Sequence, residues 1–173
     1  SDFGRGIGFK EDVNENSRRI LLKELNIPES GNGIPDILSE AEWGLKYLIL
    51  GQREDGAIAA WVETRQHEAD WPWHSEEKYY IGKHNRQDSL RYAKCASKMA
   101  RALKMIGTEE ALKKSAMYLN SAIRAFDFGV NPDNAADFSF TQKDAYGNEY
   151  KFHYTETAAK ADCFIFPAAV SLF

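Results

Sequence analysis

Residues 87–129 carry the pattern that most restricts the fold of this chain, because it describes two helices with almost no loop between them. Apolar residues recur at helical spacing from about Gln87 to Ile106, and Gly107 can then adopt the left-handed conformation that ends a helix. Thr108 follows at once as a helix N-cap, and the two glutamates after it favour the positive end of the helix dipole. The segment therefore predicts a helical hairpin with a very short turn.

Stripes of apolar residues mark the faces that we expect the helices to bury. In the second helix of the hairpin the stripe is Leu112, Leu119, Ile123 and Phe126. A separate helix is predicted from Pro35–Asp36 to about Gln52, since proline suits a first turn and an acid favours its positive end. Its stripe is Leu38, Ala41, Leu45 and Leu48. A last helical stretch starts near Glu156 and contains Pro167, where we expect a break or a fresh start.

The segments between the helices predict the architecture. Residues 138–154 alternate aromatic side chains around a turn at 144–148, which indicates a small β-hairpin. The long connections, roughly 53–86 and 129–155, have a length that is usually functional in a compact domain. Helical pairs joined tightly at one end and by long loops at the other describe an α/α toroid, whose long loops line a cleft on one face. We therefore expect a mainly α single domain, residues 1–173, with long loops and a small β-hairpin.

Charge and composition argue against several classes of function. The net charge of −4 disfavours a nucleic-acid or anionic-membrane partner, because such binding needs clustered lysine and arginine. No apolar run approaches the roughly 20 residues that span a bilayer. No glycine-rich phosphate loop or nucleophile elbow is present, and we expect no organic cofactor. Cys95 and Cys163 lie in helical or apolar contexts, so we expect two buried thiols, with a single disulfide as the alternative in an oxidising compartment.

The run at residues 25–38, Leu-Asn-Ile-Pro-Glu-Ser-Gly-Asn-Gly-Ile-Pro-Asp-Ile-Leu, resembles one that is characteristic of glycoside hydrolase family 9, the cellulase type. Family members follow it with a helix that ends in a glutamine and an Asp-Gly turn. Further segments of this chain resemble the family in the same order: Glu40-Ala41, Trp43-Gly44-Leu45, residues 52–56, Tyr80-Ile81-Gly82-Lys83, residues 89–102 and residues 163–173. The likeness spans nearly the whole chain, although only the first run is specific.

The resemblance implies an (α/α)6 barrel, of which this chain is the central segment, and inverting hydrolysis of β-1,4-glucosidic bonds in cellulose or related β-glucans. Inversion needs a carboxylate base and a carboxylic acid roughly 6.5–9.5 Å apart. In the family the base lies in an Asp-Ala-Gly-Asp motif upstream of the first run, and the acid lies far downstream. We therefore expect no catalytic residue in this segment, which alone would be inactive. The resemblance also implies a secreted, periplasmic or cell-surface location.

The loop at residues 29–36 places two carboxylates and an amide around two glycines. Ca²⁺ prefers six to eight oxygen ligands, which mix side chains with backbone carbonyls of the kind that a glycine-rich turn exposes. Some family members bind calcium, and we expect Glu29, Asn32 and Asp36 to help ligate a structural Ca²⁺ here. The alternative is that Glu29 and Asp36 only hydrogen-bond the loop and cap the helix.

The segment at residues 67–74 gathers histidines, acids and two tryptophans. Pyranose rings have flat C–H faces that stack on indoles, while histidine and carboxylate groups bond to sugar hydroxyls. The family uses this loop for sugar subsites, so the candidate substrate-binding residues are His67, Trp71, Trp73 and His74. The alternative is a loop held in place by its own aromatic side chains. A zinc site is disfavoured because the spacing matches no standard ligand pattern.

Three further expectations complete the interpretation. The aromatic hairpin at 138–154 could contact substrate, but its alternate spacing favours packing onto the barrel. His84 and His153 stand alone and are expected to be surface or packing residues. The complete protein is expected to be an endo-acting enzyme with a polysaccharide or oligosaccharide substrate. Two alternatives stay open: a non-catalytic carbohydrate-binding or structural helical module on this fold, and an exo-acting glucosaminidase on the same scaffold.

Overall fold

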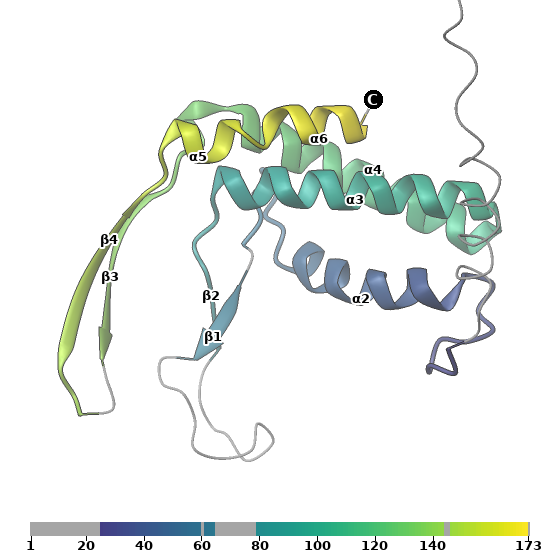
Figure 1. The fold of residues 1–173 in the computed structure, drawn as a ribbon, viewed down its shortest axis with the longest axis horizontal. Helices are drawn as coiled ribbons and strands as arrows, with labels where there is room; N and C mark the ends of the chain where they lie inside the picture. Colours follow the sequence, from purple (N-terminus) through teal and green to yellow (C-terminus); the bar gives the residue numbers. More distant parts are fainter. Residues whose placement is uncertain (1–24, 60, 65–78, 144–145, 173) are drawn as a thin grey trace, which may run out of the picture.

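The chain folds as a stack of helices from which two antiparallel β-ribbons extend at the same end (Figure 1). The computed structural model describes residues 25–59, 61–64, 79–143 and 146–172. The elements in chain order are α2 (Asp36–Leu50), β1 (Val62–Thr64), β2 (Tyr79–Ile81), α3 (Arg86–Ile106), α4 (Glu109–Val130), the short 3-10 helix η2 (Pro132–Asn134), β3 (Asp137–Lys143), β4 (Glu149–Thr155), α5 (Ala158–Asp162) and α6 (Ile165–Leu172). The mainly helical class and the β-hairpin predicted from the sequence are confirmed.

The α3–α4 hairpin forms the centre of the stack, and only Gly107 and Thr108 separate its helices. Gly107 has a φ of 77° and its N–H donates to the Leu103 carbonyl at 3.3 Å, as a left-handed helix cap does. The Thr108 hydroxyl accepts from the Ala111 N–H at 3.3 Å and begins α4. The connection is too short for anything but antiparallel packing, which confirms the predicted hairpin.

The face of α4 that packs against α3 is not the one that the sequence predicts. Leu112, Leu119 and Ile123 are 40–45% exposed, and Phe126 is only partly buried. The buried residues of α4 are mostly small, namely Ala111, Ser115, Tyr118, Ser121, Ala122, Ala125, Phe128 and Gly129. On α3, the residues that meet this face include Ala100, whose carbonyl accepts from the Ser115 hydroxyl, and the larger Tyr92 and Leu90, which lie against Ser121 and Gly129. Small side chains let the two helix axes approach closely, so the alanine face meets the partner and the leucine face turns outward.

α2 packs more loosely on this hairpin than its apolar stripe suggests. Leu45 is buried and Leu38 and Leu48 are partly buried, but Ala41 is exposed. These four residues line an open apolar cavity of about 860 Å³ between α2 and α3. The firm attachment of α2 is instead polar, through the carboxylate of the buried residue Glu42.

Glu42 is 2% exposed and connects α2 to α4. Its carboxylate accepts from the Lys114 ammonium at 2.7 Å and from the Tyr118 hydroxyl at 3.2 Å. Burial and the neighbouring Glu42 carboxylate raise the pKa of the Tyr118 phenol well above its usual range, so the phenol keeps its proton and donates. A buried carboxylate is tolerated here because two donors from α4 satisfy it.

The segment after α2 is tied across α4 by one glutamine. The Gln52 amide donates to the carbonyls of Gly56 and Ser121 at 3.1 and 3.0 Å, and it accepts from the Ser121 hydroxyl and the Arg124 guanidinium, both at 2.7 Å. Gly56 has a φ of 92°, and a Cβ there would collide with the Arg124 carbonyl. Gln52 and the Asp55–Gly56 turn therefore have a structural role, because they bring the chain across α4 toward the β1–β2 ribbon.

The last helical stretch divides earlier than the sequence predicts. α5 ends at Asp162 and α6 begins at Ile165, which is two residues before Pro167. Pro167 lies in the first turn of α6, where its missing N–H has no intrahelical partner to lose. Cys95 and Cys163 are both free and exposed, so the expectation of two buried thiols is wrong.

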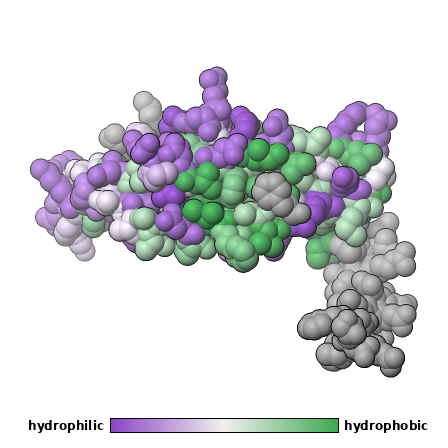
Figure 2. All heavy atoms as spheres, turned by 90° about the horizontal axis from the view of Figure 1, so that it is seen from above, coloured by the Kyte–Doolittle hydropathy of each residue, from purple (hydrophilic) through white to green (hydrophobic). Residues whose placement is uncertain are grey.

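Apolar side chains remain uncovered on the outer helix faces. Seen from the side on which α6 lies, an apolar area runs across the middle of the molecule (Figure 2). On α6, which packs against α3 and α4, Phe166 and Val170 are 77% and 57% exposed. On α2, Trp43 and Leu50 are 63% and 87% exposed. Of the helices described, none is both long and apolar enough to cross a membrane.

Candidate functional site

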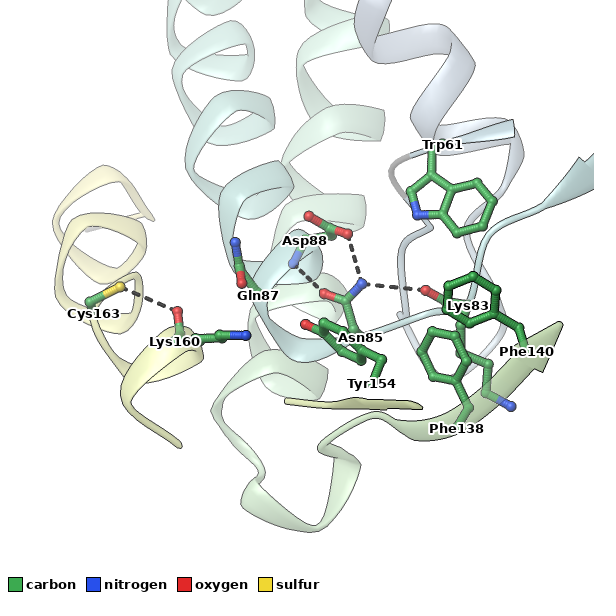
Figure 3. A pocket seen from close by; sticks show the side chains of 10 residues that line it. All are labelled: Trp61, Lys83, Asn85, Gln87, Asp88, Phe138, Phe140, Tyr154, Lys160 and Cys163. Atoms are coloured by element: carbon green, nitrogen blue, oxygen red, sulfur yellow. Dashed lines mark hydrogen bonds between the residues drawn. The ribbon is translucent and has the colours of Figure 1, made fainter. Parts of the chain in front are cut away.

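A cavity of about 680 Å³ lies where the two ribbons meet the start of α3 (Figure 3). Its walls come from β1–β2, from the first turn of α3, from the base of β3–β4 and from the α5 region. The lining residues are Trp61, Lys83, Asn85, Gln87, Asp88, Phe138, Phe140, Tyr154, Lys160 and Cys163. The volume is in the range of small-ligand sites, and the walls mix aromatic surface with polar groups, as such sites do.

One face of the β3–β4 ribbon is aromatic. In its register Phe138 lies opposite Tyr154, Phe140 opposite Phe152 and Gln142 opposite Tyr150. Opposite residues share a face of the ribbon, as does every second residue along a strand, so these aromatic side chains all lie on the same side. The opposite face carries serine, threonine, lysine and histidine.

The aromatic rings of this face contact one another. The ring centroids of Phe138 and Tyr154 are 5.3 Å apart, and those of the stacked pair Phe140 and Phe152 are 5.2 Å apart. The sequence favours packing of these rings onto the helices, yet Phe140 and Phe152 remain 44% exposed, and Phe138, Phe140 and Tyr154 line the cavity. The ribbon itself extends away from the helix stack (Figure 1).

Trp61 forms the wall across from the β3–β4 ribbon. It immediately precedes β1, and its carbonyl accepts from the Gly82 N–H at 2.8 Å. A Cβ at Gly82 would collide with the Trp61 indole, so the glycine allows the ring to lie against the backbone after β2. The indole is 44% exposed and lines the cavity.

A buried glutamate holds the base of the β3–β4 ribbon against the start of α3. Glu156 is 3% exposed, and its carboxylate accepts from the backbone N–H groups of Arg86, Gln87 and Ala136 at 3.0, 2.6 and 3.0 Å. A carboxylate at a helix N-terminus satisfies free N–H groups and favours the helix dipole. Glu156 therefore fixes the angle at which the ribbon leaves the helices.

Arg86 completes this junction from within α3. Its guanidinium donates to the Gly129 carbonyl at 2.8 Å and pairs with Asp162 of α5 at 2.8 Å. The sequence predicts no role for Arg86 or for the Glu156 carboxylate. Their partners lie 20 to 76 residues away along the chain, so no local pattern could have revealed them.

The polar side of the cavity is built on the helix cap of α3. The Asn85 side chain accepts from the Asp88 N–H at 2.8 Å and donates to the Asp88 carboxylate at 2.7 Å and the Lys83 carbonyl at 3.3 Å. Burial, followed by the charges of Glu156 and Asp88, raises the pKa of the Tyr154 phenol. The Tyr154 hydroxyl thus remains protonated at neutral pH and can donate a hydrogen bond.

The sugar-binding residues predicted from the sequence, His67, Trp71, Trp73 and His74, lie outside the described residues. They belong to the connection between β1 and β2, which are paired in antiparallel register from Val62–Ile81 to Thr64–Tyr79. This connection begins at the end of β1, the strand that directly follows Trp61 of the cavity.

The predicted calcium ligands lie at the other end of the molecule, beside the start of α2 (Figure 1). The Asp36 carboxylate accepts through Oδ2 from the Leu25 N–H at 2.7 Å and the Ser30 hydroxyl at 2.6 Å. Glu29 accepts through Oε1 from the Trp43 indole at 3.1 Å, and Asn32 accepts from the Ile34 N–H at 2.7 Å. These bonds match the part of the alternative in which Glu29 and Asp36 hydrogen-bond the loop, but no side chain caps the start of α2. Only one oxygen of each carboxylate takes part in these bonds. The described residues contain no group of three or more His, Cys, Asp or Glu side chains that could hold a metal.

The two isolated histidines are where the sequence predicts them. The His84 ring is partly buried and its Nε2 lies 3.0 Å from the Gly51 carbonyl, which is a packing role. His153 is exposed on the polar face of β4, within 3.2 Å of the Asp137 carboxylate.

The sequence is similar to short stretches of two cellulose-degrading enzymes. No family model matches the chain. A cellulose 1,4-beta-cellobiosidase of Acetivibrio thermocellus is 30% identical over 89 residues, which cover 46% of this chain and 10% of that protein. Endoglucanase C of Cellulomonas fimi is 36% identical over 47 residues, which cover 27% of this chain and 4% of that protein.

Solved structures extend the likeness along the chain. A metagenome-derived glycoside hydrolase family 9 endoglucanase matches with a TM-score of 0.65 and 27% identity over 92% of this chain. The resemblance to glycoside hydrolase family 9 is confirmed. A family 9 protein of Bacteroides ovatus shares the fold with a TM-score of 0.66 at 21% identity. The chain spans 27% and 29% of these two structures, so it is similar to a segment of each.

Proposed function

We propose that this chain is part of an endo-acting, inverting β-1,4-glucan hydrolase. The observation that carries the proposal is an aromatic-lined cavity on a fold that is similar, over 92% of the chain, to a family 9 endoglucanase. Pyranose rings present flat C–H faces that stack on aromatic side chains and hydroxyl edges that need polar partners. Trp61 and Phe140 are the stacking groups of the cavity, and Gln87 and Tyr154 are its hydrogen-bonding groups.

The β1–β2 connection belongs to the same proposal. His67, Trp71, Trp73 and His74 are the residues that we propose for further stacking and hydroxyl contacts with the sugar.

This segment contributes substrate contacts and not the catalytic pair. The general base and the general acid come from the rest of an (α/α)6 catalytic domain, which also covers the exposed apolar faces of α2, α4 and α6. The exposed apolar side chains on these helices support this proposal, because contiguous exposed apolar surface is normally buried in an interface. Secretion, or display at the cell surface, would bring such an enzyme to its polymer.

The test uses the full-length protein that carries this chain, with barley β-glucan and cello-oligosaccharides as substrates. We expect new reducing ends, random internal cleavage, and products whose initial anomeric configuration, followed by NMR, is inverted. Binding without turnover would support the non-catalytic module in place of the enzyme. Release of terminal glucosamine units, with no cleavage of glucan, would support the exo-acting glucosaminidase.

We also propose a structural Ca²⁺ at the loop of Glu29, Asn32 and Asp36. The second carboxylate oxygens of Glu29 and Asp36, together with backbone carbonyls of the glycine-rich turn, are oxygen donors of the type that Ca²⁺ prefers. Such an ion would stiffen the loop that begins α2, far from the cavity. Its effect is therefore expected on stability and not on turnover.

A further inference from the structure

The charge of the cavity differs in sign from that of the chain. The chain has a net charge of −4, yet the cavity lining contains two lysines, Lys83 and Lys160, and one acid, Asp88. Clefts lined by one sign of charge concentrate ligands of the opposite sign. The local balance of charge therefore favours a ligand that carries negative charge.

The one acid of the lining is already occupied by protein groups. The Asp88 carboxylate accepts from the Asn85 amide at 2.7 Å and lies 3.9 Å from the Arg91 guanidinium. It lies in the first turn of α3, where the helix dipole favours a negative charge. Asp88 is thus partnered by its own helix, and it does not pair with either lysine of the cavity.

The two lysines keep their charge available. Among the ion pairs of the described residues, none involves Lys83 or Lys160, and both side chains are exposed. The Lys160 ammonium lies 5.3 Å from the centre of the Tyr154 ring, at the aromatic side of the cavity. By contrast, Lys143 and Lys114 pair with glutamates at 2.7–2.8 Å.

A neutral glucan would not use these charges well. Sugar hydroxyls can be bonded by amides and phenols, which the cavity already offers, whereas an ammonium gains most from a carboxylate. In a uronic acid the carboxylate replaces the hydroxymethyl group and projects from the rim of the sugar ring. A ring that stacks on Trp61 or on the Phe138–Phe140 wall keeps that carboxylate at its edge, where an ammonium at the side of the cavity can meet it.

We propose that the cavity binds a uronic acid residue of a β-linked glycan, whose carboxylate is favoured by the positive charges of Lys83 and Lys160 at two sides of the cavity (Figure 3). This inference rests on the proposed carbohydrate-binding function and narrows its substrate class to acidic or acid-decorated β-glycans. No covalent step is assigned to the lysines, which act as specificity residues.

The experiment compares two ligands that differ only at C6, in the full-length protein. Cellotetraose and the β-1,4-linked tetramer of glucuronic acid have the same linkage and ring configuration, and calorimetry gives the Kd of each. We expect the acidic tetramer to bind more tightly, and its affinity to fall with added salt while that of cellotetraose does not. Substitution Lys83→Met or Lys160→Met should weaken binding of the acidic tetramer by roughly fivefold each, the upper range for an exposed ion pair.

Control variants separate charge recognition from folding. Lys83→Arg and Lys160→Arg should keep most of the preference. Lys151→Met removes a lysine from the opposite, polar face of the same ribbon and should leave both affinities unchanged. Equal Kd values for the two tetramers, or a preference that survives in the Lys83→Met/Lys160→Met double variant, would overturn the inference.

The outcome for the neutral tetramer keeps the two proposals distinct. Binding and hydrolysis of cellotetraose without a preference for the acidic tetramer would remove the uronate site and leave the glucanase proposal standing. Lysine-dependent binding of the acidic tetramer, with no turnover of any neutral glucan, would keep the uronate site and refute the glucanase.

Discussion

The α3–α4 hairpin and the β3–β4 ribbon are both rich in apolar residues, but they use them in opposite ways. In the contact between the helices, α4 presents mostly alanine and serine together with Tyr118, and α3 adds Tyr92 and Leu90, all of them buried. On the ribbon, phenylalanines and tyrosines share one face and remain up to half exposed. Small residues allow two helices of the chain to pack closely, whereas large exposed rings provide a surface on which a ligand or another part of the protein can bind. The comparison indicates that the size of an apolar residue here is a poor guide to its burial.

The junction between the two regions should be the most sensitive point. Glu156→Ala leaves three N–H groups without an acceptor at a buried site, so we expect a loss of about 3 kcal/mol or more in the free energy of unfolding. Chemical denaturation of the full-length protein measures this loss. Glu156→Gln keeps part of the hydrogen bonding and should lose less. A variant as stable as the parent would show that the ribbon needs no such anchor.

The helical region should resist an increase in side-chain size. Ala122 is fully buried between the helices, and Ala122→Leu should cost about 1–3 kcal/mol by overpacking. Ala116 lies on the exposed face of the same helix, and Ala116→Leu is the matched control, with an effect within about 0.5 kcal/mol. Equal thermal stability of the two variants would contradict the assignment of the buried face of α4.

The ribbon should show the reverse behaviour, with an effect on binding and little on folding. Phe140→Ala removes a ring that lines the cavity and is 44% exposed, so we expect KM for cello-oligosaccharides to rise about fivefold, from a lost stacking contact of roughly 1 kcal/mol. The same increase is expected for Trp71→Ala or Trp73→Ala. Steady-state kinetics together with Tm values provide the measurement. A lower Tm with an unchanged KM would mean that these rings only support the fold.

A modest effect on stability, with no effect on KM, is expected at the end of α2 that lies far from the cavity. If Ca²⁺ binds the Glu29 loop at tenfold above its Kd, the ion adds about 1.4 kcal/mol of stability through mass action. Differential scanning fluorimetry with EGTA and with added calcium should show a Tm difference of a few degrees, which Asp36→Asn should abolish. No change in Tm under either condition would remove the ion and leave the loop to its hydrogen bonds.

Local patterns were enough to predict the α3–α4 helical hairpin and the β3–β4 hairpin. The Gly107–Thr108 pair allows one helix to end and the next to begin, because each residue acts within a few positions of itself. The alternating aromatic residues around Gly147 predicted the β3–β4 hairpin in the same way. Where a signal is of short range, the sequence alone is sufficient.

Packing, by contrast, was predicted poorly, as the stripe of Leu112, Leu119 and Ile123 illustrates. These residues have the spacing of a buried face, but α4 buries its alanine face instead, because small side chains let the α3 and α4 axes come closer together. The distance between the two axes depends on the side chains of both helices. The free thiols of Cys95 and Cys163 are exposed for a related reason, since burial depends on which neighbour covers a helix face.

The sequence by itself determined the helical class, the short turn, the aromatic ribbon and the likeness to family 9, because each of these depends on residues that are close together in the sequence. Only the tertiary structure decided which faces are buried, how Glu156 and Arg86 join segments far apart in the chain, and that two lysines and four aromatic rings line one cavity. The physical reason is range: hydrogen-bond caps and strand alternation act over a few residues, whereas burial and charge balance are properties of surfaces that form only when distant segments meet.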